Sequence, residues 1–374
     1  MSNARKLADN LPSVGQLGNR NLIINGAQNV NQRGNQTGVT SNTHGTDRFE
    51  ISASGRDELV YSTAQDSDVP SGYGFANSLK FTTTTAESAI ASDEYVSLWQ
   101  QIEAQNLQHL AYGTSSAKKV TASFWVKSSI TGTFCFGLYK DDSTSQVHNK
   151  TYTISSASTW EHKTITFEAN TLTGGGINDD NGIGLYATWQ LASGSNYDSG
   201  SSTSSGWASY TTTNWCEPGT TDAVITTTNA TFQLTGVQLE VGPQSTPFEH
   251  EPFGVTLSKC QRYTYVIGGS GVTTLGGGTM YNSTAVNIDV NLPVQLRTSP
   301  ALTTVANGTG NWLSVYVGAT GTSSNATPQL GDGVQASIRI YATGAHSGSS
   351  PSAAGAAIWC MVLAGAKLII NAEL

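Results

Sequence analysis

Residues 122–139 read ASFWVKSSITGTFCFGLY, and this stretch decides the fold class. Two sets of side chains alternate along it. The apolar set is Ala122, Phe124, Val126, Phe134, Phe136 and Leu138, and the intervening set is Ser123, Trp125, Lys127, Cys135, Gly137 and Tyr139. A period of two residues places the two sets on opposite faces of a β-strand. The stretch therefore predicts two half-buried strands.

The same alternation recurs in further short runs before residue 253. Its apolar positions are Ile165, Phe167, Ile183, Leu185, Ala187, Trp189, Phe232, Leu234, Val237, Leu239 and Val241. No helical pattern of about 10–15 residues separates these runs, as it would in an α/β protein. We therefore expect residues 21–253 to form an antiparallel β-sandwich of the jelly-roll kind.

A second, smaller β-sandwich is predicted for residues 254–374, after the Pro-bounded segment 244–252. Short strand-like runs separated by Gly-rich turns continue there, at residues 257–265, 285–294, 313–317, 336–341 and 357–370. The longest apolar stretch, residues 353–366, is too short to span a membrane as a helix, and we expect a pair of buried strands.

Residues 1–20 differ from the rest of the chain. A helical pattern over residues 3–11 is stopped by Pro12, and Gly15 and Gly18 follow. This segment has no apolar run of signal-peptide length. We expect a short N-terminal arm.

Composition excludes several classes of protein. Among 374 residues, 18 Lys and Arg stand against 26 Asp and Glu, for a net charge of −8, so a basic nucleic-acid-binding surface is not expected. The 8 Trp, 14 Tyr and 10 Phe argue against disorder. The four cysteines are scattered without a CxxC pair, so the sequence predicts neither a zinc site nor a disulfide framework. We therefore expect the chain to fold in a reducing cytoplasm.

The segment 193–215 has the composition of a recognition loop. Fifteen of its 23 residues are Gly, Ser or Thr, and Tyr197, Trp207, Tyr210 and Trp215 are set among them. Rigid aromatic rings on a small-residue loop are typical of binding surfaces, and they can stack on the CH groups of a sugar ring. The alternative is that the Trp rings pin the loop to the sandwich as part of the core.

A second candidate surface comes from the strand alternation. Trp125, Lys127 and Tyr186 point away from the apolar positions and can line one open sheet face that binds a glycan. The alternative is that this face packs on a neighbouring subunit or on the second domain. Trp189 shares the face of Ile183 and Leu185 and is expected in the core.

No catalytic site is predicted. A glycosidase needs two carboxylates held about 5–10 Å apart, and no spacing singles out a pair among the acidic residues Glu103, Glu161, Asp179, Asp180 and Asp198. The histidines accompany neither a nucleophile elbow nor an HExxH string. We therefore expect a protein that is not an enzyme and needs no cofactor.

A set of short strings, in order along the chain, carries a resemblance. They are NLIINGA at 21–27, QRG at 32–34, DRF at 47–49, QIE at 101–103, SFWVKS at 123–128, NGIGL at 181–185, TGVQLEVG at 235–242, TPFEH at 246–250, CQRY at 260–263 and LPVQLRTSP at 292–300. This set resembles phage tail-fibre proteins that carry a jelly-roll carbohydrate-binding-like module. The resemblance covers most of residues 20–302 and does not extend to residues 303–374.

The resemblance implies a virion component of a tailed phage, made in the host cytoplasm, exposed on the particle and assembled as a homotrimer. It implies host-surface polysaccharide and other virion proteins as partners, the latter through residues 1–20. Related glycan-binding modules often hold a structural calcium ion through two carboxylates. Here Asn25, Gly26, Ala27 and Gln28 stand at the first place and Thr235 at the second, so no metal is expected.

Three functions remain at this point. The first is a tail fibre that recognises a host-surface glycan without catalysis. The second is a capsid-decorating or tail-assembly protein whose module is a spacer without glycan binding. The third is a polysaccharide depolymerase, which the lack of a repeat or a placed acid pair disfavours.

Overall fold

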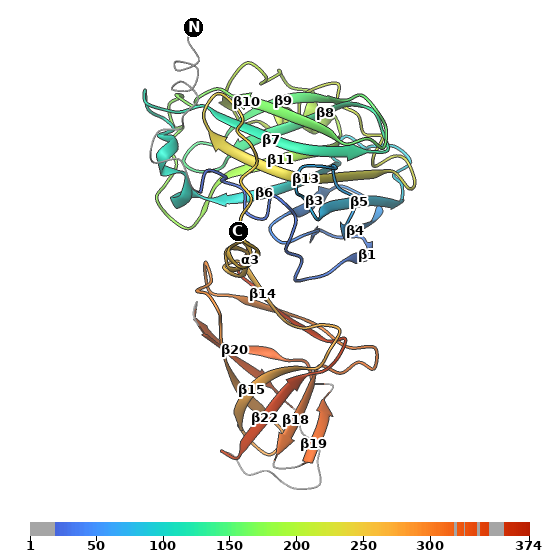
Figure 1. The fold of residues 1–374 in the computed structure, drawn as a ribbon, viewed down its shortest axis with the longest axis vertical. Coiled ribbons are helices and arrows are strands. Elements are labelled where there is room, and N and C mark those ends of the chain that lie inside the picture. The colour runs from blue at the N-terminus through green and yellow to red at the C-terminus, as the bar shows by residue number, and fades with distance from the viewer. Residues whose placement is uncertain (1–18, 318–319, 325, 335–336, 344–354) are drawn as a thin grey trace. The chain divides into compact units, whose positions relative to one another are not determined.

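The computed structural model describes residues 19–317, 320–324, 326–334, 337–343 and 355–374. The chain divides into two compact units, residues 1–253 and 254–374 (Figure 1). Both are built almost entirely from β-strands, and all pairings between the named strands are antiparallel. The N-terminal arm over residues 1–18, including the helix expected at 3–11, lies outside the described residues.

The first unit is a jelly-roll β-sandwich of two sheets. One sheet has the strand order β1 (Gln36–Val39), β4 (Val60–Asp66), β5 (Ser78–Thr85), β13 (Thr231–Val241), β7 (Val120–Ser128), β10 (Glu161–Phe167). The other has the order β12 (Ala208–Ser209), β9 (Gln146–Ile154), β8 (Gly132–Lys140), β11 (Ile183–Ser193), β6 (Tyr95–Glu103), β3 (Glu50–Ser54), β2 (Thr43–His44). Short helical segments are η1 (Ala104–Leu110), α2 (Ser195–Asp198) and η2 (Thr212–Asn214).

The core of the first unit lies between the two sheets and confirms the inward positions of the alternation. The strands are not half-buried as predicted, because the intervening residues Ser123 and Cys135 are buried too. Phe124 of β7 and Trp189 of β11 are fully buried, and their rings meet across the sandwich with centroids 5.6 Å apart. Phe136 of β8 completes the contact, with its ring 4.7 Å from that of Trp189. Because inward residues are apolar on both sheets, the intervening residues face outward.

The second unit is a smaller β-sandwich. Its three-stranded sheet has the order β14 (Thr264–Gly268), β23 (Lys367–Asn371), β17 (Ala301–Val305). Its seven-stranded sheet has the order β19 (Thr320–Ser324), β18 (Leu313–Val317), β22 (Ala357–Val362), β15 (Thr273–Met280), β16 (Val286–Asn291), β21 (Ser337–Ala342), β20 (Gln329–Val334). Both sheets contribute to one separate core, which includes Ile370, Ile288 and Val315.

Two predicted elements of the second unit are wrong. Residues 257–265 were expected as a strand, but Phe253–Gln261 is the helix α3, and β14 begins only at Thr264. The buried positions Thr256 and Cys260 are four residues apart, which fits a helix. Within the described part of the apolar stretch, residues 355–366, there is one strand, β22, and the second begins beyond it at Lys367.

None of the helices among the described residues is long and apolar enough to cross a membrane. All four cysteines, Cys135, Cys216, Cys260 and Cys360, are buried free thiols.

A buried histidine makes the first unit sensitive to acid. His148 of β9 is fully buried beside the rings of Phe167 and Trp207, at 5.0 and 5.8 Å, and burial lowers its pKa from 6.5 to about 4. Between these two values the unfolded chain binds a proton and the folded chain does not, so stability falls as the pH falls through this window. We expect a loss of roughly 2–3 kcal/mol between about pH 7 and pH 4.

Urea denaturation of the wild type and of His148→Leu at about pH 7 and pH 4.5 measures this contribution. The variant should lose less stability on acidification than the wild type. An equal loss in both proteins would show that other groups dominate the acid sensitivity.

Candidate functional site

Aromatic side chains gather on the outer face of the seven-stranded sheet of the first unit. In its central strands Tyr186 of β11 pairs with Tyr139 of β8 on one side and with Gln101 of β6 on the other. Two residues further along β11, and so on the same face, Thr188 lies opposite Trp99. Directly paired residues point to the same face of a sheet, so Tyr139, Tyr186 and Trp99 project outward together.

The segment 194–217 is attached to this sheet and brings three more rings to it. Its strand β12 pairs with β9, and the buried Asn149 of β9 donates hydrogen bonds from Nδ2 to the carbonyls of Asn214 (2.9 Å) and Trp215 (3.3 Å). The N–H of Tyr210 donates to the carbonyl of Ser145 at 2.9 Å. These bonds fix the segment over the sheet in an ordered path.

Seven rings form one connected group, which we name the aromatic cluster. Its members are Tyr95, Trp99, Tyr139, Tyr186, Tyr197, Tyr210 and Trp215. Trp215 lies at its centre, with ring centroids 5.4 Å from Tyr139, 6.1 Å from Tyr210 and 6.2 Å from Trp99. Trp215 is buried and the other six side chains are half-buried, so part of each of these six residues remains in contact with solvent.

Polar groups orient the rings of the aromatic cluster. Trp99 Nε1 donates to Glu50 Oε2 at 3.0 Å, and the Tyr139 hydroxyl donates to Asp141 Oδ1 at 2.8 Å. Burial raises the pKa of Tyr186 to about 12, and burial also raises the pKa of Tyr139 above its ordinary value. The phenols are therefore neutral at physiological pH and can both donate and accept hydrogen bonds.

This combination suits a sugar. Aromatic rings stack on the CH groups of a pyranose, and fixed hydroxyls and carboxylates bond its OH groups. The charged groups bonded to the cluster, Glu50 and Asp141, are both acidic. The carboxylate of Asp141 repels an anionic ligand at the Tyr139 hydroxyl, so the arrangement suits an uncharged sugar better than a uronic acid.

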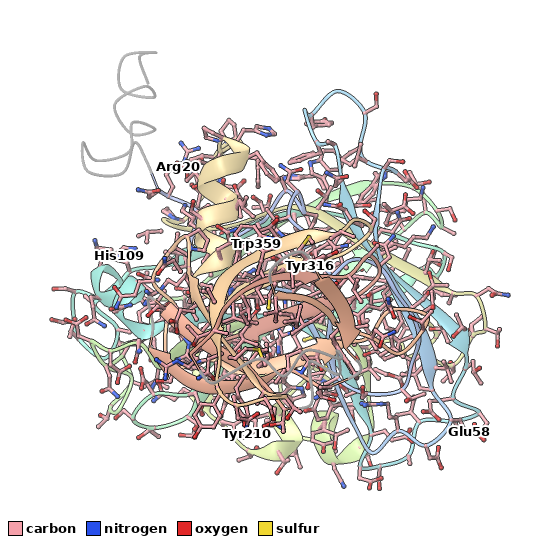
Figure 2. All side chains as sticks on the ribbon, turned by 90° about the horizontal axis from the view of Figure 1, so that it is seen from below. Arg20, Glu58, His109, Tyr210, Tyr316 and Trp359 are labelled. Atoms are coloured by element: carbon pink, nitrogen blue, oxygen red, sulfur yellow. The ribbon has the colours of Figure 1, made fainter. Side chains whose placement is uncertain are left out.

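Four residues predicted from the sequence come together in this cluster, namely Tyr186, Tyr197, Tyr210 and Trp215. Tyr210 is labelled in Figure 2. Trp207 does not join them. It is 9% exposed within the core of the first unit, and its Nε1 donates to the carbonyl of Glu168 at 2.8 Å. The expectation that Trp207 faces a ligand is therefore corrected, because its ring packs the segment against the core. The same expectation is corrected for Trp215, because its ring is only 7% exposed and supports the surrounding rings of the cluster from beneath.

The expectation that Trp125, Lys127 and Tyr186 line one sheet face is wrong. Trp125 and Lys127 belong to β7 of the six-stranded sheet, whereas Tyr186 belongs to β11 of the opposite sheet. Since all three point away from the core between the sheets, they lie on opposite faces of the sandwich. Alternation assigns a face within a strand but does not say which sheet the strand joins.

The outward face around Trp125 holds a loop in place. The Trp125 ring lies 4.3 Å from that of Tyr73 and 5.1 Å from that of His162. Lys127 Nζ forms an ion pair with Asp68 Oδ2 at 2.6 Å. These contacts fasten the connection between β4 and β5 to the sheet.

Three members of the aromatic cluster were not predicted as binding residues, namely Tyr95, Trp99 and Tyr139. The alternation did place Tyr139 outward, and that was the available signal. Trp99 and Tyr95 join the cluster only because β6 pairs with β11. Residue spacing does not specify which strands pair.

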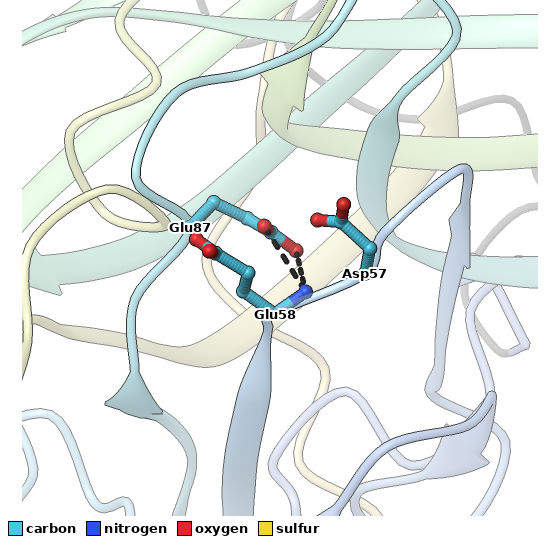
Figure 3. A group of neighbouring side chains, drawn as sticks. All are labelled: Asp57, Glu58 and Glu87. Carbon is cyan, nitrogen blue, oxygen red and sulfur yellow. Dashed lines mark hydrogen bonds between the residues drawn. The ribbon is translucent and has the colours of Figure 1, made fainter.

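A group of carboxylates lies elsewhere in the first unit, between the ends of β4 and β5 (Figure 3). Oxygens of Asp57, Glu58 and Glu87 lie within 4.8 Å of one another. Glu87 accepts hydrogen bonds from the N–H groups of Glu58 and Leu59, at 3.3 and 2.8 Å. Glu58 accepts one from the N–H of Ser88 at 2.8 Å, which lowers the pKa of Glu58. Glu58 and Glu87 thus accept hydrogen bonds from backbone N–H groups and stabilise the chain where these segments meet.

No protein-family model matches the sequence, and no curated protein matches it. Similar solved structures are jelly-roll domains. The family 11 carbohydrate-binding module of the Clostridium thermocellum cellulase Lic26A-Cel5E is 13% identical, with a TM-score of 0.27, over 57% of this chain and 97% of the module. The CBM22-1 xylan-binding domain of Paenibacillus barcinonensis Xyn10C is 11% identical, with a TM-score of 0.28, over 60% of this chain and 96% of the domain.

A phage protein is also similar. The enzymatically active domain of tailspike protein 4 of bacteriophage CBA120 is 12% identical, with a TM-score of 0.31, over 60% of this chain. The match spans only 22% of that tailspike chain. At these TM-scores none of the likenesses supports a conclusion about ligand or activity.

Proposed function

We propose that this protein is a non-catalytic glycan-binding component of a tailed-phage virion, a tail fibre that recognises polysaccharide on the surface of the host bacterium. The observation that carries the glycan-binding part is the aromatic cluster on the outer face of the seven-stranded sheet. Its half-exposed rings, neutral phenols and fixed carboxylates together supply what recognition of an uncharged sugar requires.

The virion role rests on the ordered set of tail-fibre-like strings along residues 20–302. In this proposal the protein is exposed on the particle as a homotrimer, and residues 1–20 join it to other virion proteins. Three identical sites on one particle component raise avidity without any new contact. Weak individual sites are therefore sufficient for adhesion.

Binding of the labelled full chain to intact host cells tests the proposal, with and without prior stripping of the surface polysaccharide. We expect saturable binding that stripping abolishes, and no release of oligosaccharide from the polysaccharide during the incubation. Light scattering of the same sample gives the molar mass, for which we expect a trimer.

Two results would contradict the proposal. A well-folded oligomer that does not bind would support a spacer role in the capsid or tail. Release of oligosaccharide would establish a depolymerase.

A further inference from the structure

A second group of aromatic and polar residues lies on the outer face of the seven-stranded sheet in the second unit. Trp359 of β22 is 48% exposed, whereas its neighbours Ile358 and Cys360 point into the core. Trp359 pairs directly with Tyr316 of β18 on one side and with Gly277 of β15 on the other. Figure 2 labels Tyr316 and Trp359. The outward ring thus stands beside a strand that carries no side chain at that position.

Gly277 leaves bare backbone beside the Trp359 ring. A Cβ atom at this position would meet only the carbonyl oxygen of Ile358, at 3.7 Å, among the described residues. The next residue differs, because a Cβ on Gly278 would lie 2.1 Å from the carbonyl oxygen of Asn287. Glycine is therefore required at 278 by close packing, but the space above 277 is open.

The far side of this open strip is polar. Gly278 pairs with Ile288 of β16, so the following residue, Asp289, lies level with Gly277. Asp289 Oδ1 pairs with Arg339 Nε at 3.2 Å, and both side chains are exposed. Adjacent strands are about 4.8 Å apart, so β22 and β16 are separated by about 10 Å across β15. We name the space above Gly277 the trough. The Trp359 ring lies on one side of it, the Asp289–Arg339 ion pair lies on the other, and the backbone at Gly277 lies beneath it.

The trough suits an uncharged sugar. The Trp359 ring offers a surface for the CH groups of a pyranose, and the exposed carboxylate of Asp289 offers an acceptor for its hydroxyls. The pair carries no net charge, so it does not favour an anionic ligand. The core of a protein interface is depleted in charged residues. Here the residues side by side across the strands are Tyr316, Trp359, Gly277, Asp289 and Arg339, so a sugar fits this face better than a protein partner does.

The geometry points to a second carbohydrate-binding site in this trough, over Gly277 between Trp359 and the Asp289–Arg339 pair, for a neutral hexose unit. The inference goes beyond the aromatic cluster, because the trough belongs to a separately packed unit that the tail-fibre resemblance covers only in part. Each chain then has two sites, and binding at both raises avidity for a polymeric glycan.

The experiment uses the full chain labelled with 5-fluorotryptophan, in a background where Trp99→Ala and Tyr186→Ala disable the aromatic cluster. Trp359→Phe identifies the fluorine resonance of Trp359. Hexasaccharides of glucose, mannose and galactose are titrated as neutral probes, and an oligogalacturonate serves as the acidic probe. Gly277→Val is the matched variant, because it fills the trough where space is open and leaves the Trp359 ring in place.

We expect a saturable shift of the Trp359 resonance with at least one neutral probe in the disabled background, and at least a tenfold weaker response in Gly277→Val. No shift with any neutral probe would overturn the inference, as would an equal response in Gly277→Val. A stronger response to oligogalacturonate would overturn the assignment to a neutral sugar. A Trp359 resonance that changes with protein concentration and not with sugar would identify a contact between copies of the chain instead. Because the aromatic cluster is disabled throughout, these outcomes do not depend on the proposed function.

Discussion

Replacing Trp99 and Tyr186 together with alanine is expected to lower the affinity for the host glycan at least about 100-fold. Both side chains lie on the outer face of the seven-stranded sheet, with ring centroids 5.4 Å apart and in contact with solvent. Aromatic anchors in binding sites commonly contribute about 2 kcal/mol or more when truncated, and 1.4 kcal/mol is a factor of ten. Calorimetry with purified surface polysaccharide measures the change.

Tyr73→Ala is the matched control for this experiment. Tyr73 is 54% exposed and lies against Trp125 on the opposite sheet, so its removal takes away an aromatic ring outside the aromatic cluster. Binding should be unchanged in this variant, and the melting temperature of the double variant should stay close to that of the wild type. Loss of binding in Tyr73→Ala with full binding by the double variant would move the site to the six-stranded sheet.

Trp189→Ala is expected to destabilise the first unit by about 3–5 kcal/mol. Its side chain is fully buried between the sheets and touches the rings of Phe49, Phe124 and Phe136. Removing a buried Trp loses its transfer free energy and leaves a cavity that the surrounding strands fill only in part. Chemical denaturation followed by circular dichroism measures the loss.

The second unit provides an internal reference, because its core is separate from that of the first. Its transition should not move in Trp189→Ala. Trp359→Ala removes the same side chain from a position that is 48% exposed, and should change stability by no more than about 0.5 kcal/mol. A loss below about 1 kcal/mol in Trp189→Ala would mean that the sandwich closes over the missing ring.

Five strands of the first unit, β7, β8, β10, β11 and β13, and the inward face of each follow from the sequence alone. In residues 122–139 the period of two is a local property of the backbone, since successive side chains of a strand must point to opposite faces. Phe124, Phe136 and Trp189 are accordingly buried. The helix α3 is an exception, because its buried residues Thr256 and Cys260 have helical spacing, and the helix overlaps residues 257–265, for which the sequence predicts a strand.

The composition of segment 193–215 singled out Tyr197, Tyr210 and Trp215, which join the aromatic cluster, and also Trp207, which does not. Nothing in a run of Gly, Ser and Thr distinguishes a ring over a sheet from a ring in the core. That difference depends on Asn149, which holds one end of the segment, and on the carbonyl of Glu168, which accepts the Trp207 N–H. Both partners are distant in sequence.

The all-β class, and the side chains of a strand that share a face, can be predicted from residue order, because alternation acts between neighbouring residues. Three features emerge from folding alone: Trp125 and Tyr186 belong to opposite sheets, Trp99 joins Tyr186, and Gly277 lies beside Trp359. They could not be predicted because strand pairing depends on the packing of the whole core. A binding surface built across several strands therefore appears only when those strands are in register.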